Sequence, residues 1–232
     1  MDSIELKDVS RTYYDAQGNS FRALDHISLL WEAGQSIAIM GESGSGKSTL
    51  ARLLVGLERS SEGMVRLNGE DTTRWGFSKW RKHRAAVQAV FQDASGTLNP
   101  ARSTERNVEE ALCNVTRLPP DQRRQKIAEL MELTGLRKEL LATPVRKLSG
   151  GEQRRLALLR SLSVDPTFLV LDEVTAGLDL IATEAVIKLL QKYQQQKGCA
   201  YLVITHDIKI ASRLCDSIYE IEYGRITRKA VR

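Results

Sequence analysis

The stretch GESGSGKST, residues 41–49, places three glycines and one lysine between an apolar run and a segment with helical spacing. It satisfies the phosphate-loop pattern G-x-x-x-x-G-K-[ST]. The glycines let the backbone curl so that successive N–H groups point at phosphate oxygens, and the following helix adds its positive N-terminal end. A glycine turn that only joined a strand to a helix would leave the lysine unexplained. We therefore predict a nucleoside triphosphate site formed by Gly41, Glu42, Ser43, Gly44, Ser45, Gly46, Lys47, Ser48 and Thr49.

Two acids follow a buried run in FLVLDE, residues 168–173. Asp172 stands where the predicted strand leaves the core, a position from which a carboxylate can hold Mg²⁺ beside a phosphate loop. The hydroxyl of Ser48 is a second oxygen ligand for that ion, and Lys47 supplies charge to the β- and γ-phosphates. Adjacent strand residues point in opposite directions, so Glu173 needs a different task, and we assign it the polarisation of attacking water. The alternative is a pair of acids that merely ends a strand.

A second glycine pair lies in KLSGGE, residues 147–152, directly before another helical pattern. The Ser149 hydroxyl and the backbone N–H groups of Gly150 and Gly151 would form a second anion site at a helix N-terminus. Taken alone, the motif is equally explained by a simple helix cap.

The chain has 232 residues, a hydrophobic content of 42% and a net charge of +5, which suits one globular unit with a sizeable core. No apolar run approaches the ~20 residues that span a bilayer, and the acidic start MDSIELKDVS predicts no secretory signal. Three cysteines without C-x-x-C spacing predict reduced thiols. Because only RWGFSKWRKHR, residues 74–84, concentrates positive charge with aromatics, we expect a locally bound anion and no direct contact with nucleic acid.

Apolar runs alternate with helical spacing at both ends of the chain, which predicts a mainly parallel, helix-covered sheet. Leu50, Leu53, Leu54 and Leu57 would share one helix face. The middle is rich in helical patterns and reads as a helical subdomain at about 100–163, inserted into an α/β core at about 1–99 and 164–232. The predicted strands are 3–9, 36–40, 63–68, 86–91, 167–172, 201–205 and 217–223, and the predicted helices are 47–57, 121–134, 152–163 and 181–196.

Six motifs then follow one another in a fixed order. They are the phosphate loop, VFQD (90–93), LSGGE (148–152), LVLDE (169–173), AGLD (176–179) and ITHD (204–207). In this order the chain resembles the ATP-binding subunit of an ABC transporter from about residue 3 to 228. The resemblance implies one ABC ATP-binding domain over 1–232, with a P-loop NTPase core, an N-terminal antiparallel β portion and an inserted helical subdomain.

The resemblance also implies roles for residues that spacing alone leaves open. In the family, two such subunits pair head to tail, and the signature residues of one chain (Leu148, Ser149, Gly150, Gly151 and Glu152) act on the nucleotide of the other. Glu173 is similar to the catalytic base, and His206 to the residue that contacts the γ-phosphate. Gln92 would join the Mg²⁺ ligands and sense the γ-phosphate, and Asp179 would bridge the dimer interface. Tyr13, with Tyr14 close behind, is the aromatic expected to stack on adenine.

Two positions depart from the common family pattern. Val174 replaces a frequent proline after the catalytic Glu, and Glu152 replaces a frequent glutamine. Neither departure removes a phosphate ligand, so ATP binding and hydrolysis are still expected, with ATP and Mg²⁺ as cofactors.

The stretch FQDASGTLNPARS, residues 91–103, is similar to importers of oligopeptides, dipeptides and nickel, and STLARLLVGLE (48–58) and LQKYQQQKG (190–198) resemble the nickel importers in particular. The expected partners are a second ABC ATPase subunit (a related chain or another copy), two transmembrane permeases and an extracytoplasmic solute-binding protein. The expected location is peripheral, at the cytoplasmic face of the inner membrane. The alternatives are an exporter or lipoprotein-extraction ATPase, a soluble ABC ATPase that acts on nucleic acid or ribosomes, and a nucleotide-binding module that does not hydrolyse.

Overall fold

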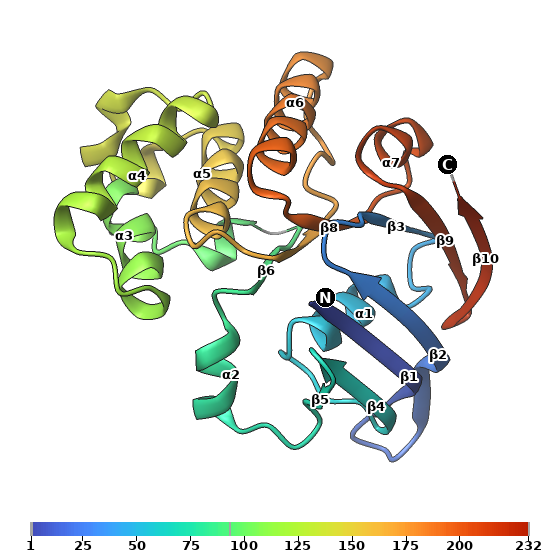
Figure 1. Cartoon of the computed structure of the whole chain (residues 1–232). Coiled ribbons are helices and arrows are strands. Elements are labelled where there is room, and N and C mark those ends of the chain that lie inside the picture. The colour runs from blue at the N-terminus through green and yellow to red at the C-terminus, as the bar shows by residue number, and fades with distance from the viewer. Residues whose placement is uncertain (1, 93, 232) are drawn as a thin grey trace. The chain divides into compact units, whose positions relative to one another are not determined.

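The computed structural model describes residues 2–92 and 94–231. The chain separates into two compact units. The first comprises residues 1–80, 170–172 and 200–232, and the second comprises residues 81–169 and 173–199. Figure 1 labels the elements of both units.

The first unit begins with a four-stranded antiparallel sheet in the order β2-β1-β4-β5. The long strands β1 and β2 lie side by side in Figure 1, and Trp31 and Val9 are buried in them. The expected N-terminal antiparallel portion is therefore present. Its strands are β1 (Ser3–Tyr14), β2 (Ser20–Glu32), β4 (Glu62–Leu67) and β5 (Glu70–Asp71).

In the second sheet of this unit, strands end at the phosphate loop, at the acid pair and at the ITHD motif. Strand β3 pairs in parallel with β8 on one side and β9 on the other, and β10 closes the edge as an antiparallel hairpin with β9. The sheet continues from β8 to β7. All residues of β7 and β8 are buried, as expected for strands covered on both faces. These strands are β3 (Ile37–Met40), β7 (Phe168–Asp172), β8 (Ala200–Ile204), β9 (Ser217–Glu222) and β10 (Arg225–Val231).

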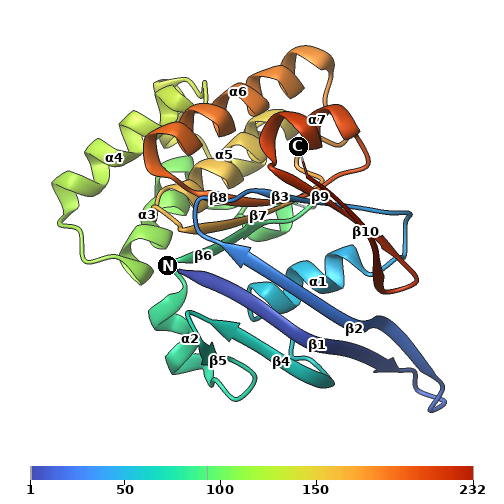
Figure 2. The ribbon, with the colours of Figure 1, turned by 45° about the vertical axis from the view of Figure 1, so that its right-hand side comes forward.

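Helix α1 (Lys47–Leu54) follows the phosphate loop, and Figure 2 shows it lying along β2. Leu50, Leu53 and Leu54 are buried on one face, as predicted, but Leu57 is exposed. The reason is that the helix ends at Leu54 and the chain turns at Gly56, whose φ is 66°. Helix α7 (Ile208–Leu214) also belongs to this unit, whereas α2 (Phe77–His83) lies where the division passes.

The second unit is mostly helical. Val108, Ile127, Met131 and Leu159 contribute to its core. The backbone N–H of Phe168 donates to the carbonyl of Ala86, just before strand β6 (Val87–Val90). Its helices are α3 (Thr104–Val115), α4 (Pro120–Leu133), α5 (Gly150–Leu162) and α6 (Leu180–Lys197), with short 3₁₀ turns at Ala94–Thr97, Lys138–Ala142 and Val145–Lys147.

Each predicted strand and helix is present, with shifts of a few residues at the ends. Six of the helices and strands in the described residues were not predicted from the sequence, namely β2, β5, α2, α3, α7 and β10. In the part of the chain that the structure describes, no helix combines the length and the apolar character needed to cross a membrane.

Candidate active site

The phosphate loop runs from the end of β3 at Met40 to the first turn of α1. Gly46 is the N-cap of that helix and has φ 106°, a left-handed value that favours glycine. A Cβ atom on Gly46 would lie 2.3 Å from the carbonyl oxygen of Ala23, and one on Gly41 would lie 2.2 Å from that of Ile221. Both glycines are thus fixed by close backbone packing as well as by conformation.

The lysine of the motif donates hydrogen bonds to residues earlier in the phosphate loop. Lys47 Nζ donates to the carbonyl oxygens of Gly41 at 2.8 Å and Glu42 at 2.5 Å, and to Ser45 Oγ at 3.4 Å. An ammonium held inside a curled backbone at a helix N-terminus offers positive charge to an anion on the loop. Ser48 is exposed in the first turn of α1, while Thr49 beside it is buried.

The register of the parallel sheet brings the ITHD motif beside this loop. Ile39 of β3 lies opposite Ile204 of β8, and the N–H of Thr205 donates to the carbonyl of Ile39 at 3.3 Å. His206 therefore leaves its strand next to the start of the phosphate loop, and its side chain is exposed. Asp207 then caps α7 by accepting from the N–H of Lys209 at 2.7 Å. The next residue after the histidine is thereby held in place.

The acid pair ends strand β7. Asp172 is only 4% exposed and belongs to the same unit as the phosphate loop. Glu173 is partly exposed and has φ 49°, an uncommon value for a residue with a long side chain. The N–H of Ala176 donates back to the Glu173 carbonyl at 3.0 Å and stabilises this turn. Strained residues of this kind cluster at functional sites.

Tyr13 is half-buried near the end of β1. Its hydroxyl donates to Glu58, which also pairs with Arg52, and it lies 3.4 Å from Thr49 Oγ1. The guanidinium carbon of Arg11 lies 4.5 Å from the centre of the Tyr13 ring. The tyrosine thus takes part in a polar cluster that ties β1 to the end of α1. Tyr14 is 73% exposed.

The second glycine motif opens α5. Ser149 is the N-cap, and its Oγ accepts from the N–H of Glu152 at 3.3 Å. The Glu152 carboxylate accepts in return from the Ser149 N–H at 2.8 Å and from the Ser149 hydroxyl at 2.9 Å. This is a complete capping box. Leu148 is buried before it, whereas Gly150 is exposed.

The AGLD segment lies in the same unit as this helix. Arg154 of α5 donates to the carbonyl of Ala176 at 2.6 Å, so the signature helix holds the loop directly. Asp179 caps α6 and accepts from the N–H of Ala182 at 2.8 Å. Leu180 and Ile181, in the first turn of α6, are 87% and 84% exposed.

Gln92 is exposed two residues after β6 in the second unit, and Asp93 of the VFQD motif lies outside the described residues. The loop that follows is organised by buried Asn107. Its amide donates to the carbonyls of Asn99 at 3.1 Å and Ser103 at 3.0 Å, and its Oδ1 accepts from the Asn99 N–H at 2.8 Å.

The family model described as "ABC transporter" matches residues 24–176, well over half of the chain. The chain belongs to the ABC transporter family. It is 34% identical to the nickel import ATP-binding protein NikE of Escherichia coli O6:K15:H31 (strain 536) over 100% of this chain and 88% of that protein. It is 36% identical to NikE of Escherichia coli K12, over 90% of this chain and 78% of that protein.

Solved ABC structures agree in fold over almost the whole chain. The dimeric ATP-binding cassette MJ0796, in a post-hydrolysis state with ADP and Pi, matches with a TM-score of 0.91 and 29% identity, covering 98% of each chain. The protein cbiO1 of Clostridium perfringens, part of the ABC transporter complex cbiONQ, matches with a TM-score of 0.83 and 29% identity, covering 98% of this chain and 88% of that one. The chain is an ABC ATPase with the expected α/β fold.

The structure groups the expected ABC site residues in two sets. Tyr13, the phosphate loop, Asp172 and His206 lie in the first unit, and Gln92, Glu173, the signature and Asp179 lie in the second. Glu173 is joined to Asp172 by one peptide bond. Arg154 and Asn107, which position the AGLD loop and the loop after Gln92, were not predicted from the sequence. The arginine pair that follows the LSGGE motif was the only sequence signal for Arg154. The sequence carries no signal for Asn107.

The oxygen ligands expected for Mg²⁺ are the Ser48 hydroxyl, the Asp172 carboxylate and the Gln92 amide. Such hard oxygen donors suit this ion, which also keeps several waters and binds substrate phosphates. Asp172 is buried at the end of strand β7, and its carboxyl group offers oxygen atoms of this kind. The donor set therefore fits Mg²⁺.

Glu152 stands where the family commonly has glutamine, and its charge is expected to affect the ATPase rate. The backbone N–H of Ser149 and then its hydroxyl hold the pKa of the Glu152 carboxyl below its usual range, so the group is an anion at neutral pH. This negative charge lies beside the serine that is expected to meet a γ-phosphate. Two like charges about 4 Å apart in water repel by about 1 kcal/mol, so Glu152→Gln should raise the ATPase rate roughly fivefold at limiting protein concentration.

The rate should be measured as phosphate release over a range of protein concentrations. Glutamine still closes the capping box, so helix stability should be retained. Glu139→Gln, which changes an exposed acid in the same unit, is the matched control and should leave the rate unchanged. A rate for Glu152→Gln at or below that of the natural chain would show that the carboxylate does not oppose the nucleotide.

Proposed function

We propose that this chain is the ATP-hydrolysing subunit of an importer that moves a small solute through partner permeases. The observation that carries the proposal is the phosphate loop, in which Lys47 donates to the carbonyl of Gly41. His206 follows the strand that pairs with β3, and buried Asp172 ends strand β7 of the same sheet. The intact Glu173 and His206 favour hydrolysis over mere nucleotide binding.

In this proposal the chain's own residues divide the chemistry of ATP hydrolysis. Lys47 turns from the loop carbonyls to the β- and γ-phosphates, and His206 holds a γ-phosphate oxygen. Glu173 accepts a proton from water as the water oxygen bonds to the γ-phosphorus. The bond from that phosphorus to the β–γ bridging oxygen breaks, which releases ADP and phosphate. Bound Mg²⁺ would supply neutralisation of the phosphate charge, held by Ser48, Asp172 and Gln92.

We further propose that the catalytic site is completed by a second ATPase subunit. Ser149, Gly150 and Gly151 present a hydroxyl and a helix N-terminus that suit a phosphate. The exposed Leu180 and Ile181 beside Asp179 support a protein interface in the second unit. The partner is a related subunit or a second copy of this chain.

The proposed cargo is a peptide or a nickel complex. The names of the NikE relatives and the FQD and LNP pattern of this chain support import. An exporter or lipoprotein-extraction ATPase would share every catalytic motif, so the ATPase site does not separate these possibilities. Uptake of radioactive nickel and of labelled dipeptides by cells that express the chain with its permeases, and with a solute-binding protein, would separate them.

Permeases are proposed to dock near Gln92 and the Asn107-ordered loop after it, at the cytoplasmic face of the membrane. ATP would favour the closed ATPase pair and hydrolysis would release it, because a ligand shifts an equilibrium by its differential affinity for the two states.

The test of the proposal is complementation between two inactive variants. Ser149→Arg should block the signature, and Lys47→Ala should block the phosphate loop. If the signature acts in trans between two copies of this chain, a mixed pair keeps one intact site, formed by the Lys47 of one copy and the Ser149 of the other. Random pairing should then restore about a quarter of the natural ATPase rate, since half of the pairs are mixed and each has one working site of two.

Ser103→Arg is the matched control, because Ser103 also caps a helix in the same unit and accepts from the Arg106 N–H at 3.3 Å. Each substitution should cost about 1 kcal/mol of stability through the lost cap, yet only Ser149→Arg should abolish hydrolysis. Full activity of the isolated monomer at every concentration, unaffected by Ser149→Arg, would contradict the proposal.

A further inference from the structure

The segment from Glu173 to Asp179 joins strand β7 to helix α6, and two consecutive turns hold its backbone. The N–H of Ala176 donates to the carbonyl of Glu173 at 3.0 Å, and the N–H of Leu178 donates to that of Thr175 at 3.2 Å. The Asp179 side chain then caps α6. The turn at Ala176 is therefore bonded directly to the residue proposed as the catalytic base.

Glu173 needs support from its surroundings because its backbone is strained. Its φ of 49° is uncommon for a residue with a long side chain, and such a conformation persists only where neighbouring groups hold it. Relaxation to a negative φ would redirect the side chain. A general base must lie within hydrogen-bond reach of the proton that it accepts, so the function of Glu173 depends on this turn.

Arg154 supports the turn from a different element. It lies in α5, it is partly buried, and its Nη1 donates to the carbonyl of Ala176 at 2.6 Å. Hydrogen bonds from a charged donor are stronger than those between neutral groups. Ala176 is thus held at its carbonyl by Arg154 and at its N–H by Glu173. Helices α5 and α6 lie side by side in both Figure 1 and Figure 2, and the segment leads into α6.

We propose that Arg154 is a positioning residue for Glu173. The inference rests on the proposed function, because it takes Glu173 as the base that accepts a proton from water. Arg154 acts through Ala176: it fixes the turn, the turn keeps Glu173 at its positive φ, and the carboxylate stays directed at the water. Because α5 begins at Ser149, the helix that presents the signature also holds the turn of the base.

The test compares Arg154→Met with Arg154→Lys. Both replacements have long unbranched side chains that suit a helix, but only lysine can donate a hydrogen bond. The natural bond uses one guanidinium nitrogen, so an ammonium group can replace it. For Arg154→Met we expect kcat for ATP hydrolysis to fall roughly tenfold, since a small displacement of a catalytic group is costly, while the dissociation constant of ATP changes less than about twofold. Arg154→Lys should keep most of kcat.

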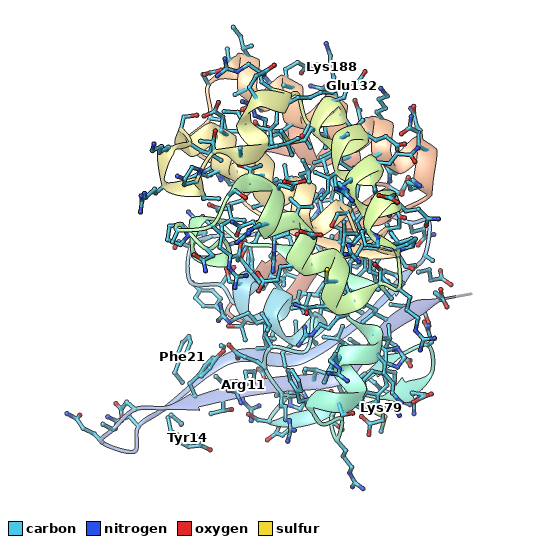
Figure 3. The ribbon with its side chains drawn as sticks, turned by 90° about the vertical axis from the view of Figure 1, so that its left-hand side faces the viewer. Arg11, Tyr14, Phe21, Lys79, Glu132 and Lys188 are labelled. Carbon is cyan, nitrogen blue, oxygen red and sulfur yellow. The ribbon has the colours of Figure 1, made fainter. Side chains whose placement is uncertain are left out.

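A double-mutant cycle with Glu173→Gln separates positioning of the base from a general effect on the fold. In that background the base is absent, so Arg154→Met should change the residual hydrolysis rate by less than about twofold. Lys188→Met is the matched control in the same unit and should leave kcat unchanged. Lys188 is exposed on α6 and pairs with Glu184 at 3.7 Å, and Figure 3 shows it at the surface.

Two results would overturn the inference and leave the proposed ATPase function standing. One is an equal kcat for Arg154→Met and Arg154→Lys, and the other is an equal loss by Arg154→Met with and without the Glu173 carboxylate. Hydrolysis by Glu173→Gln at the natural rate would overturn both the inference and the assignment of the base.

Discussion

Lys47→Ala is expected to lower the ATPase rate by ~10²-fold or more, the cost typical of losing one preorganised charge-stabilising group. Two effects combine at this position. The substitution removes the positive charge that would meet the β- and γ-phosphates, and it also removes the donor that holds the carbonyls of Gly41 and Glu42. The loop therefore loses both the positive charge and the hydrogen bonds that Lys47 donates to its carbonyls. Phosphate release at saturating ATP is the measurement.

Lys47→Arg tests whether positive charge alone is sufficient at this position. Arginine keeps the charge, but its planar fork cannot occupy the position of a compact ammonium inside the loop, so its activity should also be low. Lys188→Ala is the control, because that lysine is exposed on α6 and pairs with Glu184 at a loose 3.7 Å. Turnover by Lys47→Ala close to that of the natural chain would remove the phosphate loop from the proposed site.

The parts of the fold that were predictable are those where one local pattern has one physical explanation. Strand β7 is a run of apolar residues between polar ones, and it is buried throughout. The phosphate loop was predictable because a glycine pattern with lysine has few other uses. The order of six motifs then identified the family, which spacing at any single motif could not do.

Strands β2 and β10, which were not predicted, lack a local pattern with a single physical explanation. Strand β2 has no clean alternation, because its pairing with β1 shifts register three times and His26 has φ 53°. Strand β10, with the sequence RITRKAV, mixes charges into the pattern, which an edge strand tolerates. The sequence indicates neither the pairing of β10 with β9 nor the turn at Tyr223 between them. These depend on contacts between segments some 200 residues apart, such as that of Asp25 with Arg225.

The residues of the candidate site also divide into those that local sequence predicts and those that it does not. The positions of Lys47 at the phosphate loop and of Asp172 at the end of a strand follow from local sequence. The structure adds to the sequence the hydrogen bonds of Glu152, whose carboxylate closes the capping box of α5. The task of Ser149 needs a second molecule, so neither the sequence nor the fold of one chain can establish it, and complementation is the suitable experiment.

Glu173→Gln should have the other large effect, a loss of hydrolysis of ~10²–10⁴-fold with ATP binding retained, as expected when a general base is removed. The amide has the shape of the carboxylate but cannot accept a proton from water. The backbone at Glu173 already adopts φ 49°, and glutamine bears the same strain, so the turn to Ala176 should persist. The ATP-bound pair can then close without reopening, and it should accumulate as a dimer in size-exclusion chromatography with ATP and Mg²⁺.

Asp172→Asn provides the contrast one residue earlier. Its side chain is buried at the end of β7 and is proposed to hold Mg²⁺, so its loss should weaken the Mg²⁺ dependence of ATP binding and prevent the dimer. Glu184→Gln, on the exposed side of α6, should behave as the natural chain. The two adjacent acids would thereby be assigned separate tasks by two separate measurements, binding and hydrolysis. If Glu173→Gln hydrolyses ATP at the natural rate, the base is another residue, and the strained turn after β7 requires a structural explanation.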